Sequence, residues 1–240
     1  MKLTEAGFKE VLPSTLFLLE SQTADLSRMQ LNNIASSTKR FDLVLRSITT
    51  TLFCDKTPDP RFGIWCFFPQ PPDAAQKQNA LFFQRALGYN SLLTIERQLA
   101  ELLAPLVLTN EYQEKDLFPY ANTEIAKAFE TDKKLDLNTL FSLFLFRGTI
   151  FDSLKWLAQK GYSFIILDEE GEAKYLEEKL ELDARQVFII GDKDDWNREI
   201  IPFFDTHKIE YQKISLGPLS YLASTCITLV KMHYDLAELV

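Results

Sequence analysis

The sequence predicts an α/β domain in which helices cover both faces of a mostly parallel sheet. Short apolar segments typical of buried strands alternate along the chain with segments of helical periodicity. Several of the strand-like segments are apolar throughout, as strands are when both faces of a sheet are covered. No internal repeat or low-complexity linker interrupts the sequence, so we expect a single domain over residues 1–240.

The first half of the chain contains two predicted strands and two predicted helices. Residues 14–20 and 63–68 are apolar runs that predict strands, and the second run is ended by the prolines of PQPPD. Residues 41–53 and 92–104 carry apolar residues at helical spacing. The polar stretch 21–40 between the first strand and the first helix predicts a loop.

The last third of the chain has a more regular pattern. The segments YSFIILDEEGE, QVFIIGDKDDW and IEYQKISLG predict three strands, the first of which enters an acidic turn. Between the last two strands, REIIPFFDTH predicts a short helix interrupted by Pro202. A final helix follows, with Leu219, Leu222, Ala223, Cys226, Leu229, Val230 and His233 on its apolar face and Lys231, Asp235 and Glu238 on its polar face.

Composition indicates a globular protein and argues against several classes of function. Apolar residues make up 46% of the chain and charged residues 25%. No apolar run reaches the roughly 18 residues that span a membrane, and the N-terminus lacks the apolar core of a signal peptide. We therefore expect a cytoplasmic protein without a membrane partner.

Net charge and the small number of metal-ligating residues argue against two further classes of function. The net charge of −8 argues against broad nucleic-acid binding, but residues 168–210, with 14 acidic and 6 basic residues, carry all of it. A basic patch elsewhere is therefore still compatible with the composition. The three cysteines match no zinc motif and are expected to be buried thiols, and with two histidines we expect no metal site.

Three strand ends in the last third share a form that could make a ligand site. They are Leu167-Asp168, Ile190-Gly191-Asp192 and Leu216-Gly217-Pro218. Ligands collect beyond the carboxyl ends of strands in open α/β sheets, and glycine lets a backbone approach a ligand closely. Ordinary strand-to-helix turns would explain the same residues. No G-x-G-x-x-G, P-loop or G-x-S-x-G motif is present, and the acidic run Asp192, Asp194 and Asp195 predicts a solvated turn.

A second cluster of charged residues lies at the start of the first predicted helix. Lys39, Arg40, Asp42 and Arg46 lie within eight residues, and Asp42 and Arg46 are four apart, so they can pair on one helix face. One interpretation is a surface ion pair that orders the helix. The other is a substrate site, because arginine recognises phosphate well.

Five segments resemble the archaeal-type tRNA (pseudouridine-54 N1)-methyltransferases of the SPOUT superfamily. The most specific is SLGPLSYLASTCITLV, which resembles the family's C-terminal signature S-L-G-P-x-S-Y-L-A-S-H-C-I. The others are KRFDLVLRSITTTLF, FFPQPPDA, FIILDEEGE and FIIGD. Their order and approximate spacing agree with the family over about residues 14–240, apart from an insertion-like segment at about residues 105–150.

The resemblance implies a fold, a cofactor and partners. The fold is the SPOUT α/β knot, a deep C-terminal trefoil knot at about residues 160–240, and the partners are RNA, in particular tRNA, and a second copy of the chain. The cofactor is S-adenosyl-L-methionine (SAM). By motif match, the cofactor-binding residues are Leu167, Gly191, Leu216, Gly217, Pro218, Leu219, Ser220, Tyr221 and Cys226.

The resemblance also implies a function, SAM-dependent methylation of N1 of pseudouridine in tRNA. Asp42 is the candidate catalytic residue, as proton acceptor or base-edge contact, and Arg40 and Arg46 are candidates to hold RNA phosphate. The alternatives are a non-catalytic knotted binding or assembly protein and a SAM-dependent methyltransferase with another RNA or a protein as acceptor.

Three departures from the family pattern support these alternatives. The family's G-D-H-x-G reads GDKDD from Gly191, S-H-C reads Ser224-Thr225-Cys226, and N-G-P-P-D reads PQPPD from Pro69. Two histidines and one glycine of the family pattern beside the expected cofactor pocket are therefore replaced.

Overall fold

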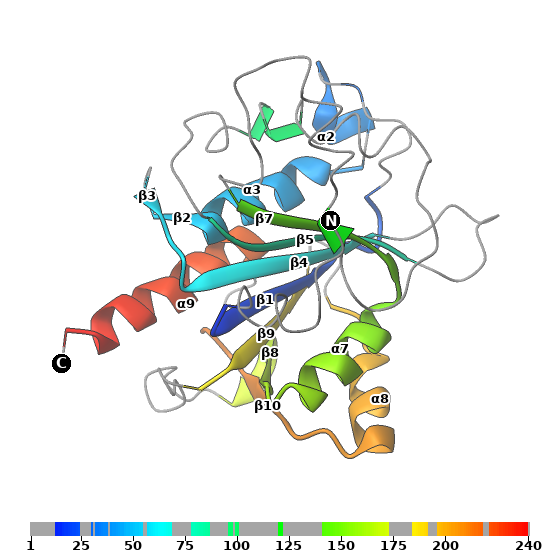
Figure 1. The fold of residues 1–240 in the computed structure, drawn as a ribbon, viewed down its shortest axis with the longest axis vertical. Coiled ribbons are helices and arrows are strands. Elements are labelled where there is room, and N and C mark those ends of the chain that lie inside the picture. The colour runs from blue at the N-terminus through cyan, green and yellow to red at the C-terminus, as the bar shows by residue number, and fades with distance from the viewer. Residues whose placement is uncertain are drawn as a thin grey trace.

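The structure is a computed structural model that describes residues 13–24, 30, 32–37, 39–54, 57–68, 78–86, 96–97, 99–100, 120–121, 141–172, 184–191, 196–217 and 221–239. Within these residues an eight-stranded sheet and a separate two-stranded ribbon form (Figure 1). The strands are β1 (Thr15–Glu20), β2 (Phe53–Cys54), β3 (Thr57–Pro58), β4 (Phe62–Phe68), β5 (Gln78–Ala86), β6 (Tyr120–Ala121), β7 (Phe141–Gly148), β8 (Ser163–Glu172), β9 (Gln186–Gly191) and β10 (Tyr211–Ile214). The helices are α2 (Ile34–Ser37), α3 (Phe41–Leu52), α7 (Ile150–Gln159), α8 (Ile200–His207) and α9 (Ala223–Ala237).

The large sheet is parallel over most of its width. Its order is β10-β8-β9-β1-β4-β5-β7-β6, and every pairing from β10 to β4 is parallel. β5, β7 and β6 extend the sheet by antiparallel pairing. The predicted α/β class with a mostly parallel sheet is therefore confirmed. Because neighbouring parallel strands point the same way, the carboxyl ends of β10, β8, β9, β1 and β4 lie along one edge.

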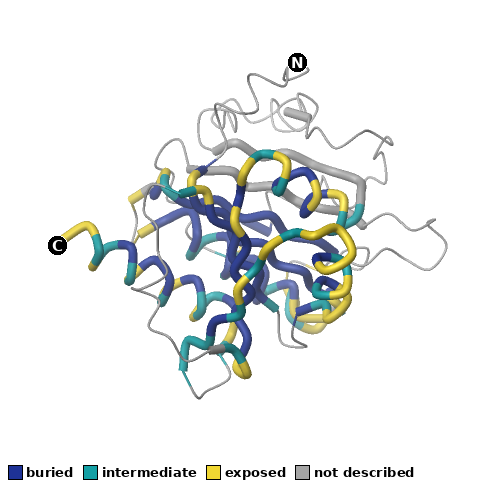
Figure 2. Tube along the Cα trace, turned by 90° about the horizontal axis from the view of Figure 1, so that it is seen from below, coloured by how far each residue is buried: buried dark blue, intermediate teal, exposed yellow. Residues whose placement is uncertain are grey.

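Helices cover the two faces of the sheet with separate apolar clusters. Alternate residues of each strand point to opposite faces. In β1, Phe17 and Leu19 pack in the cluster that contains buried residues of α3 and α9, whereas Leu16 and Leu18 pack in the cluster that contains those of α7 and α8. Figure 2 shows the resulting buried strands in the middle of the molecule with partly exposed helices around them.

The predicted strands and the first helix lie close to the observed ones, with local differences. The prediction that Pro202 interrupts its helix is wrong. Pro202 lies in the first turn of α8, where a backbone N–H has no intrahelical acceptor, so proline is tolerated there. The polar stretch 21–40 contains the short helix α2. Of the predicted helix 92–104, residues 96–97 and 99–100 are described, and all four are helical.

The prediction for the buried face of the C-terminal helix is wrong in detail. Its buried residues are Ala223, Ile227, Val230, Lys231 and Tyr234, so the face is rotated from the predicted one. Leu222, predicted on the apolar face, is 45% exposed, whereas Lys231, predicted on the polar face, is 6% exposed. Lys231 is buried because its ammonium group finds acceptors in the interior, which hydropathy cannot register.

Two further expectations concern the cysteines and the middle of the chain. Cys66 is buried and Cys226 partly buried, but Cys54 is exposed in the β2–β3 ribbon, contrary to prediction. The insertion-like segment 105–150 lies largely outside the described residues. Its described end forms β7, which pairs with β5.

Candidate functional site

The strand ends singled out in the sequence lie at one edge of the sheet. β10, β8 and β9 are consecutive neighbours and run parallel. Leu167 lies midway along β8, directly after the part of β8 that pairs with β9, while Gly191 ends β9 and Leu216 follows β10. The tertiary structure therefore brings together the three segments that the family resemblance assigns to the cofactor.

The acidic turn after Leu167 is a bulge in the β8–β10 ladder. Ile166 pairs with Lys213, but the next residue of β10, Ile214, pairs with Glu172. Five residues of β8 thus lie between two consecutive pairing positions. At the end of this bulge, a Cβ on Gly171 would lie 2.6 Å from the carbonyl carbon of Ile214, so only glycine lets the two backbones approach this closely.

A glycine turn connects β10 to the last helix. Gly217 has φ +136°, a conformation that L side chains rarely adopt. The Ser215 hydroxyl closes the turn, since it donates to the Gly217 carbonyl at 2.9 Å and accepts from the Gly217 N–H at 3.2 Å. Helix α9 then begins after Leu222 without a side-chain cap. The Thr225 N–H bonds the Leu222 carbonyl at 2.8 Å, so the N–H groups that precede it in the first turn are the ones that point toward a ligand.

Apolar side chains from these segments line the same region. Leu167, Leu216 and Cys226 all belong to or pack against the cluster beneath α3 and α9. Burial raises the pKa of the Cys226 thiol to about 11, so it is neutral near pH 7, and its Sγ lies 3.9 Å from the Tyr221 carbonyl oxygen. Cys226 therefore contributes packing surface rather than a nucleophilic thiolate.

These residues suit an adenosyl group. Apolar side chains can cover the faces of a purine ring, while the backbone groups of a glycine turn and an uncapped helix start can bond its polar edges. Leu167, Gly191, Leu216, Gly217, Tyr221 and Cys226 are described at or beside this edge. The other predicted cofactor residues, Pro218, Leu219 and Ser220, lie outside the described residues.

Asp168, next to Leu167, is a site residue to which the sequence assigns no role. Its side chain is 3% exposed and accepts from Lys213 at 2.9 Å, Arg198 at 3.0 Å and the Glu170 N–H at 2.9 Å. Burial alone would raise the pKa of Asp168, but the hydrogen bonds from Lys213 and Glu170 outweigh it and hold this pKa below its usual range. Asp168 is therefore an ionised, fully bonded carboxylate at the carboxyl edge.

The predicted substrate residues lie at the start of α3, at the same edge of the sheet. The Phe41 ring contacts that of Phe68, the last residue of β4, with centroids 5.6 Å apart. β4 and β8 are three strands apart in the sheet, a distance of about 14 Å. Arg40 and Asp42 flank Phe41, so both predicted sites belong to one edge.

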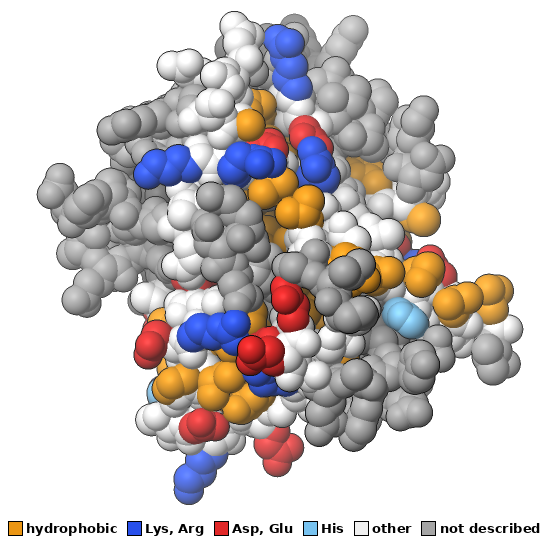
Figure 3. All heavy atoms as spheres, turned by 180° about the vertical axis from the view of Figure 1, so that it is seen from behind, with side chains coloured by type: hydrophobic (Ala, Val, Ile, Leu, Met, Phe, Trp, Pro, Cys, Tyr) orange, Lys and Arg blue, Asp and Glu red, His pale blue; other side chains and the backbone are white. Residues whose placement is uncertain are grey.

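The predicted pairing of Asp42 with Arg46 is wrong. Arg40 bonds both carboxylate oxygens of Asp42, at 3.0 and 3.1 Å, and Arg46 bonds Glu96 at 2.7 Å. Arg40 is the residue before α3 and has a backbone φ of 80°, and from there its side chain bonds Asp42 in the first turn of the helix. Glu96 is 50 residues away in the chain, so sequence spacing could not identify it. Figure 3 shows basic side chains with acidic ones beside them in the upper part of the molecule.

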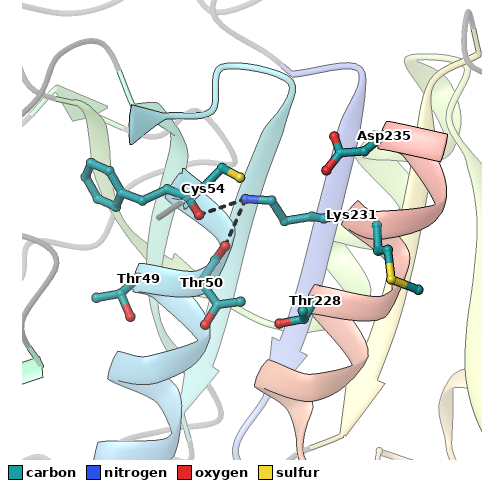
Figure 4. A pocket seen from close by; sticks show the side chains of 8 residues that line it. Thr49, Thr50, Cys54, Thr228, Lys231 and Asp235 are labelled. Carbon is teal, nitrogen blue, oxygen red and sulfur yellow. Dashed lines mark hydrogen bonds between the residues drawn. The ribbon is translucent and has the colours of Figure 1, made fainter. Parts of the chain in front are cut away.

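A groove with a volume of about 360 Å³ lies between the end of α3 and the middle of α9 (Figure 4). On its floor, the Lys231 ammonium donates to the carbonyl oxygens of Thr50, Thr51 and Phe53 at 2.9, 2.9 and 3.0 Å. It also lies 3.3 Å from the buried carboxylate of Asp59. Lys231 therefore bonds the C-terminal end of α3 to α9.

Glu20 is a further buried acid that the sequence did not single out. It ends β1, is 3% exposed, and pairs in register with Gly191 on one side and Phe67 on the other. A charged residue at the end of an apolar strand is the only signal that could have pointed to it.

The described residues contain neither a candidate membrane span nor a candidate metal site. None of the helices formed by these residues has both the length and the apolar character to cross a membrane. The same residues contain no group of three or more His, Cys, Asp or Glu side chains able to hold a metal ion.

Comparison with known proteins finds similarity to methyltransferases in part of the sequence and in the fold. Residues 122–239 match the family described as "Putative SAM-dependent RNA methyltransferase". No curated protein matches the chain. Among solved structures, it is similar to Archaeoglobus fulgidus Nep1 bound to S-adenosylhomocysteine, with TM-score 0.53 and 12% identity, over 94% of this chain and 99% of that one.

The two comparisons support different conclusions. At 12% identity the likeness to Nep1 concerns the fold, and it covers nearly the whole chain. The family match covers the part that holds β8, β9, β10 and α9, and the family's cofactor is SAM. Both findings agree with the predicted recognition, since residues 122–239 match a family of SAM-dependent RNA methyltransferases and the fold is similar to that of Nep1.

Proposed function

We propose that this protein transfers a methyl group from SAM to N1 of pseudouridine in tRNA. SAM supplies a methyl group already activated on a sulfonium. The chain therefore has to bind SAM and the acceptor, orient them toward each other and exclude water. Methyl transfer to N1 breaks the sulfur–methyl bond, forms a nitrogen–methyl bond and releases the N1 proton. A group that accepts this proton completes the chemistry.

One observation carries the cofactor part of the proposal. The ends of β8 and β9, the glycine turn after β10 and the start of α9 converge at one edge of the sheet. In that arrangement Leu167, Leu216 and Cys226 would cover the adenine, and the backbone around Gly217 would bond its polar edge. Tyr221, whose hydroxyl oxygen lies 3.5 Å from the place of a Cβ on Gly217, would close the turn side of the pocket.

The start of α3 supplies the acceptor part. Asp42 is 17% exposed and bonded by Arg40, so it is a partly accessible carboxylate that can accept a proton or hydrogen bond from a ring N–H. Arg40 and Arg46 are 48% and 43% exposed and would reach RNA phosphate.

We further propose a homodimer and the C-terminal knot. Leu222, Met232, Leu236 and Leu239 of α9 and its ends are exposed by 45–82%, and Figure 3 shows apolar side chains gathered on the side of the molecule where α9 ends. A second copy would cover such a surface.

For the knot, the close approach of Gly171 to the backbone of Ile214 brings together the two segments that a threaded chain would cross.

Two measurements test the proposed function. Calorimetric titration of the full chain with S-adenosylhomocysteine should give saturable binding with one site per chain. Incubation with methyl-labelled SAM and unmodified tRNA should label tRNA, and nucleoside mass spectrometry should identify N1-methylpseudouridine. Asp42→Asn should bind the cofactor product as tightly as the wild type but methylate slowly. Absence of binding at millimolar ligand would refute the proposal.

The pairing of both arginines favours a second candidate acceptor. Because Arg40 and Arg46 are each neutralised by a carboxylate, the acceptor surface carries less free positive charge than a tRNA phosphate backbone would favour. A SAM-dependent enzyme with another RNA or a protein as acceptor would show binding of S-adenosylhomocysteine without labelling of tRNA. A non-catalytic binding or assembly protein would label no acceptor in a total cell extract.

A further inference from the structure

One buried carboxylate, that of Asp168, connects β8 and β10 at the proposed cofactor edge with the segment that precedes α8. It lies in the bulge of β8, directly after Leu167. From β10, the Lys213 ammonium lies 2.9 Å from its Oδ2, and from the segment that precedes α8, Arg198 lies 3.0 Å from the same oxygen. Its other oxygen accepts the Glu170 N–H, so the carboxylate is bonded on both sides.

Arg198 extends this connection toward β9. Its guanidinium carbon lies 4.6 Å from the ring centroid of Trp196, which is 3% exposed. Trp196 is the first described residue after Gly191, where β9 ends. The first described residue after β9 is therefore a buried tryptophan, and the guanidinium group over its ring is bonded to Asp168 of β8.

Lys213 extends the connection toward the glycine turn. It lies two residues before Ser215, whose hydroxyl closes the turn at Gly217. The end of the bulge packs where the turn begins, since a Cβ on Gly171 would lie 2.6 Å from the carbonyl carbon of Ile214 and 2.8 Å from the backbone nitrogen of Ser215. A shift of Asp168 would therefore move the turn before α9 as well as the segment after β9.

We propose that Asp168 is a positioning residue for the cofactor, which sets the spacing of the three strand ends and acts through Lys213 and Arg198. The inference rests on the proposed function, because it assigns the cofactor to this edge. A buried carboxylate is strongly disfavoured without its partners, so the positions of Lys213 and Arg198 relative to β8 are restricted. A pocket built largely from backbone groups has few side chains of its own to set these distances.

The test is a calorimetric titration of full-length variants with S-adenosylhomocysteine. Asp168→Asn and Arg198→Ala should each raise its Kd about tenfold, which corresponds to about 1.4 kcal/mol. Because both act through one contact, the double variant should lose less than the product of the two effects. Arg198→Lys, which keeps the charge, should recover part of the affinity.

Two control variants and the folded state separate positioning from general stability. Arg185→Ala removes an exposed arginine that also lies over a ring, that of Tyr162 at 5.8 Å, and Asp205→Asn removes an exposed aspartate. Both should bind S-adenosylhomocysteine as the wild type does. All titrations are made well below each variant's unfolding midpoint, where a purely stabilising contact would leave the Kd unchanged.

The outcomes distinguish the inference from the function on which it rests. If wild-type protein binds S-adenosylhomocysteine but Arg198→Ala binds it equally well, Asp168 is not a positioning residue. If the wild type itself does not bind, the proposed function is wrong. Should Asp168→Asn fail to fold, Arg198→Ala still decides, because the side chain of Arg198 is 56% exposed and tolerates removal.

Discussion

Replacing Lys231 by methionine should destabilise the protein by about 3–5 kcal/mol, because three backbone carbonyl groups lose their hydrogen-bond donor. The ammonium bonds three carbonyl oxygens at the end of α3, those of Thr50, Thr51 and Phe53, at distances of 3.0 Å or less. Methionine fills nearly the same volume but cannot donate. The buried carbonyl groups would then lack their partner.

The magnitude follows from these contacts. Each carbonyl left without a donor costs about 1–3 kcal/mol, and partial access to water from the neighbouring groove reduces the sum. Asp59 adds little, because it keeps its two hydrogen bonds from the Arg61 side chain at 2.9 Å and a third from the Arg61 backbone N–H at 3.3 Å. The lower end of the range therefore comes from the carbonyl groups alone.

Urea unfolding followed by circular dichroism measures the effect. With a slope of about 3 kcal/mol per molar urea, the midpoint of Lys231→Met should fall by about 1 M or more. The matched control is Lys155→Met, which changes an exposed lysine of α7 and should stay within about 0.5 kcal/mol of the wild type. If Lys231→Met is as stable as this control, the carbonyl contacts do not hold α9 to α3.

Three other perturbations test further contacts. Gly171→Ala should cost about 1–3 kcal/mol, because its Cβ would overlap the Ile214 backbone, and an unchanged urea midpoint would contradict that packing. Asp59 and Asp168 have pKa values below the usual range, so each stabilises the fold above about pH 4, and this contribution is lost as the pH falls through the lower folded-state pKa. Urea midpoints between pH 7 and pH 2 measure this loss, and a flat profile would count against it. Glu96→Gln should free Arg46 and steepen the salt dependence of RNA binding by about one unit of slope in filter binding, whereas an equal slope would mean that Arg46 makes no phosphate contact.

The strand ends could be predicted because their pattern is local. Apolar runs ending at Leu167, Gly191 and Leu216 specify buried strands followed by turns. Parallel strands place such ends at one edge whatever the rest of the chain does. The residues of the candidate cofactor site thus followed from the sequence pattern together with the family resemblance.

The charged contacts could not be predicted because their partners are distant in the chain. Arg46 has Asp42 at helical spacing but bonds Glu96, and Lys231 bonds carbonyl groups about 180 residues earlier. Asp168 reads as one acid in an acidic turn until Lys213 and Arg198 are brought to it by two other segments. Only the folded chain shows which charges meet.

The sequence by itself determined the α/β class, the positions of the main strands along the chain and the segments that form the proposed cofactor edge, because periodicity and turn residues act over a few positions. The tertiary structure decided which ionisable groups are buried and bonded. Lys231 and Asp168 are charged residues that hydropathy places at the surface, yet both are buried. Their burial depends on acceptors and donors supplied by other elements, since a charge enters the interior only where its partners already lie.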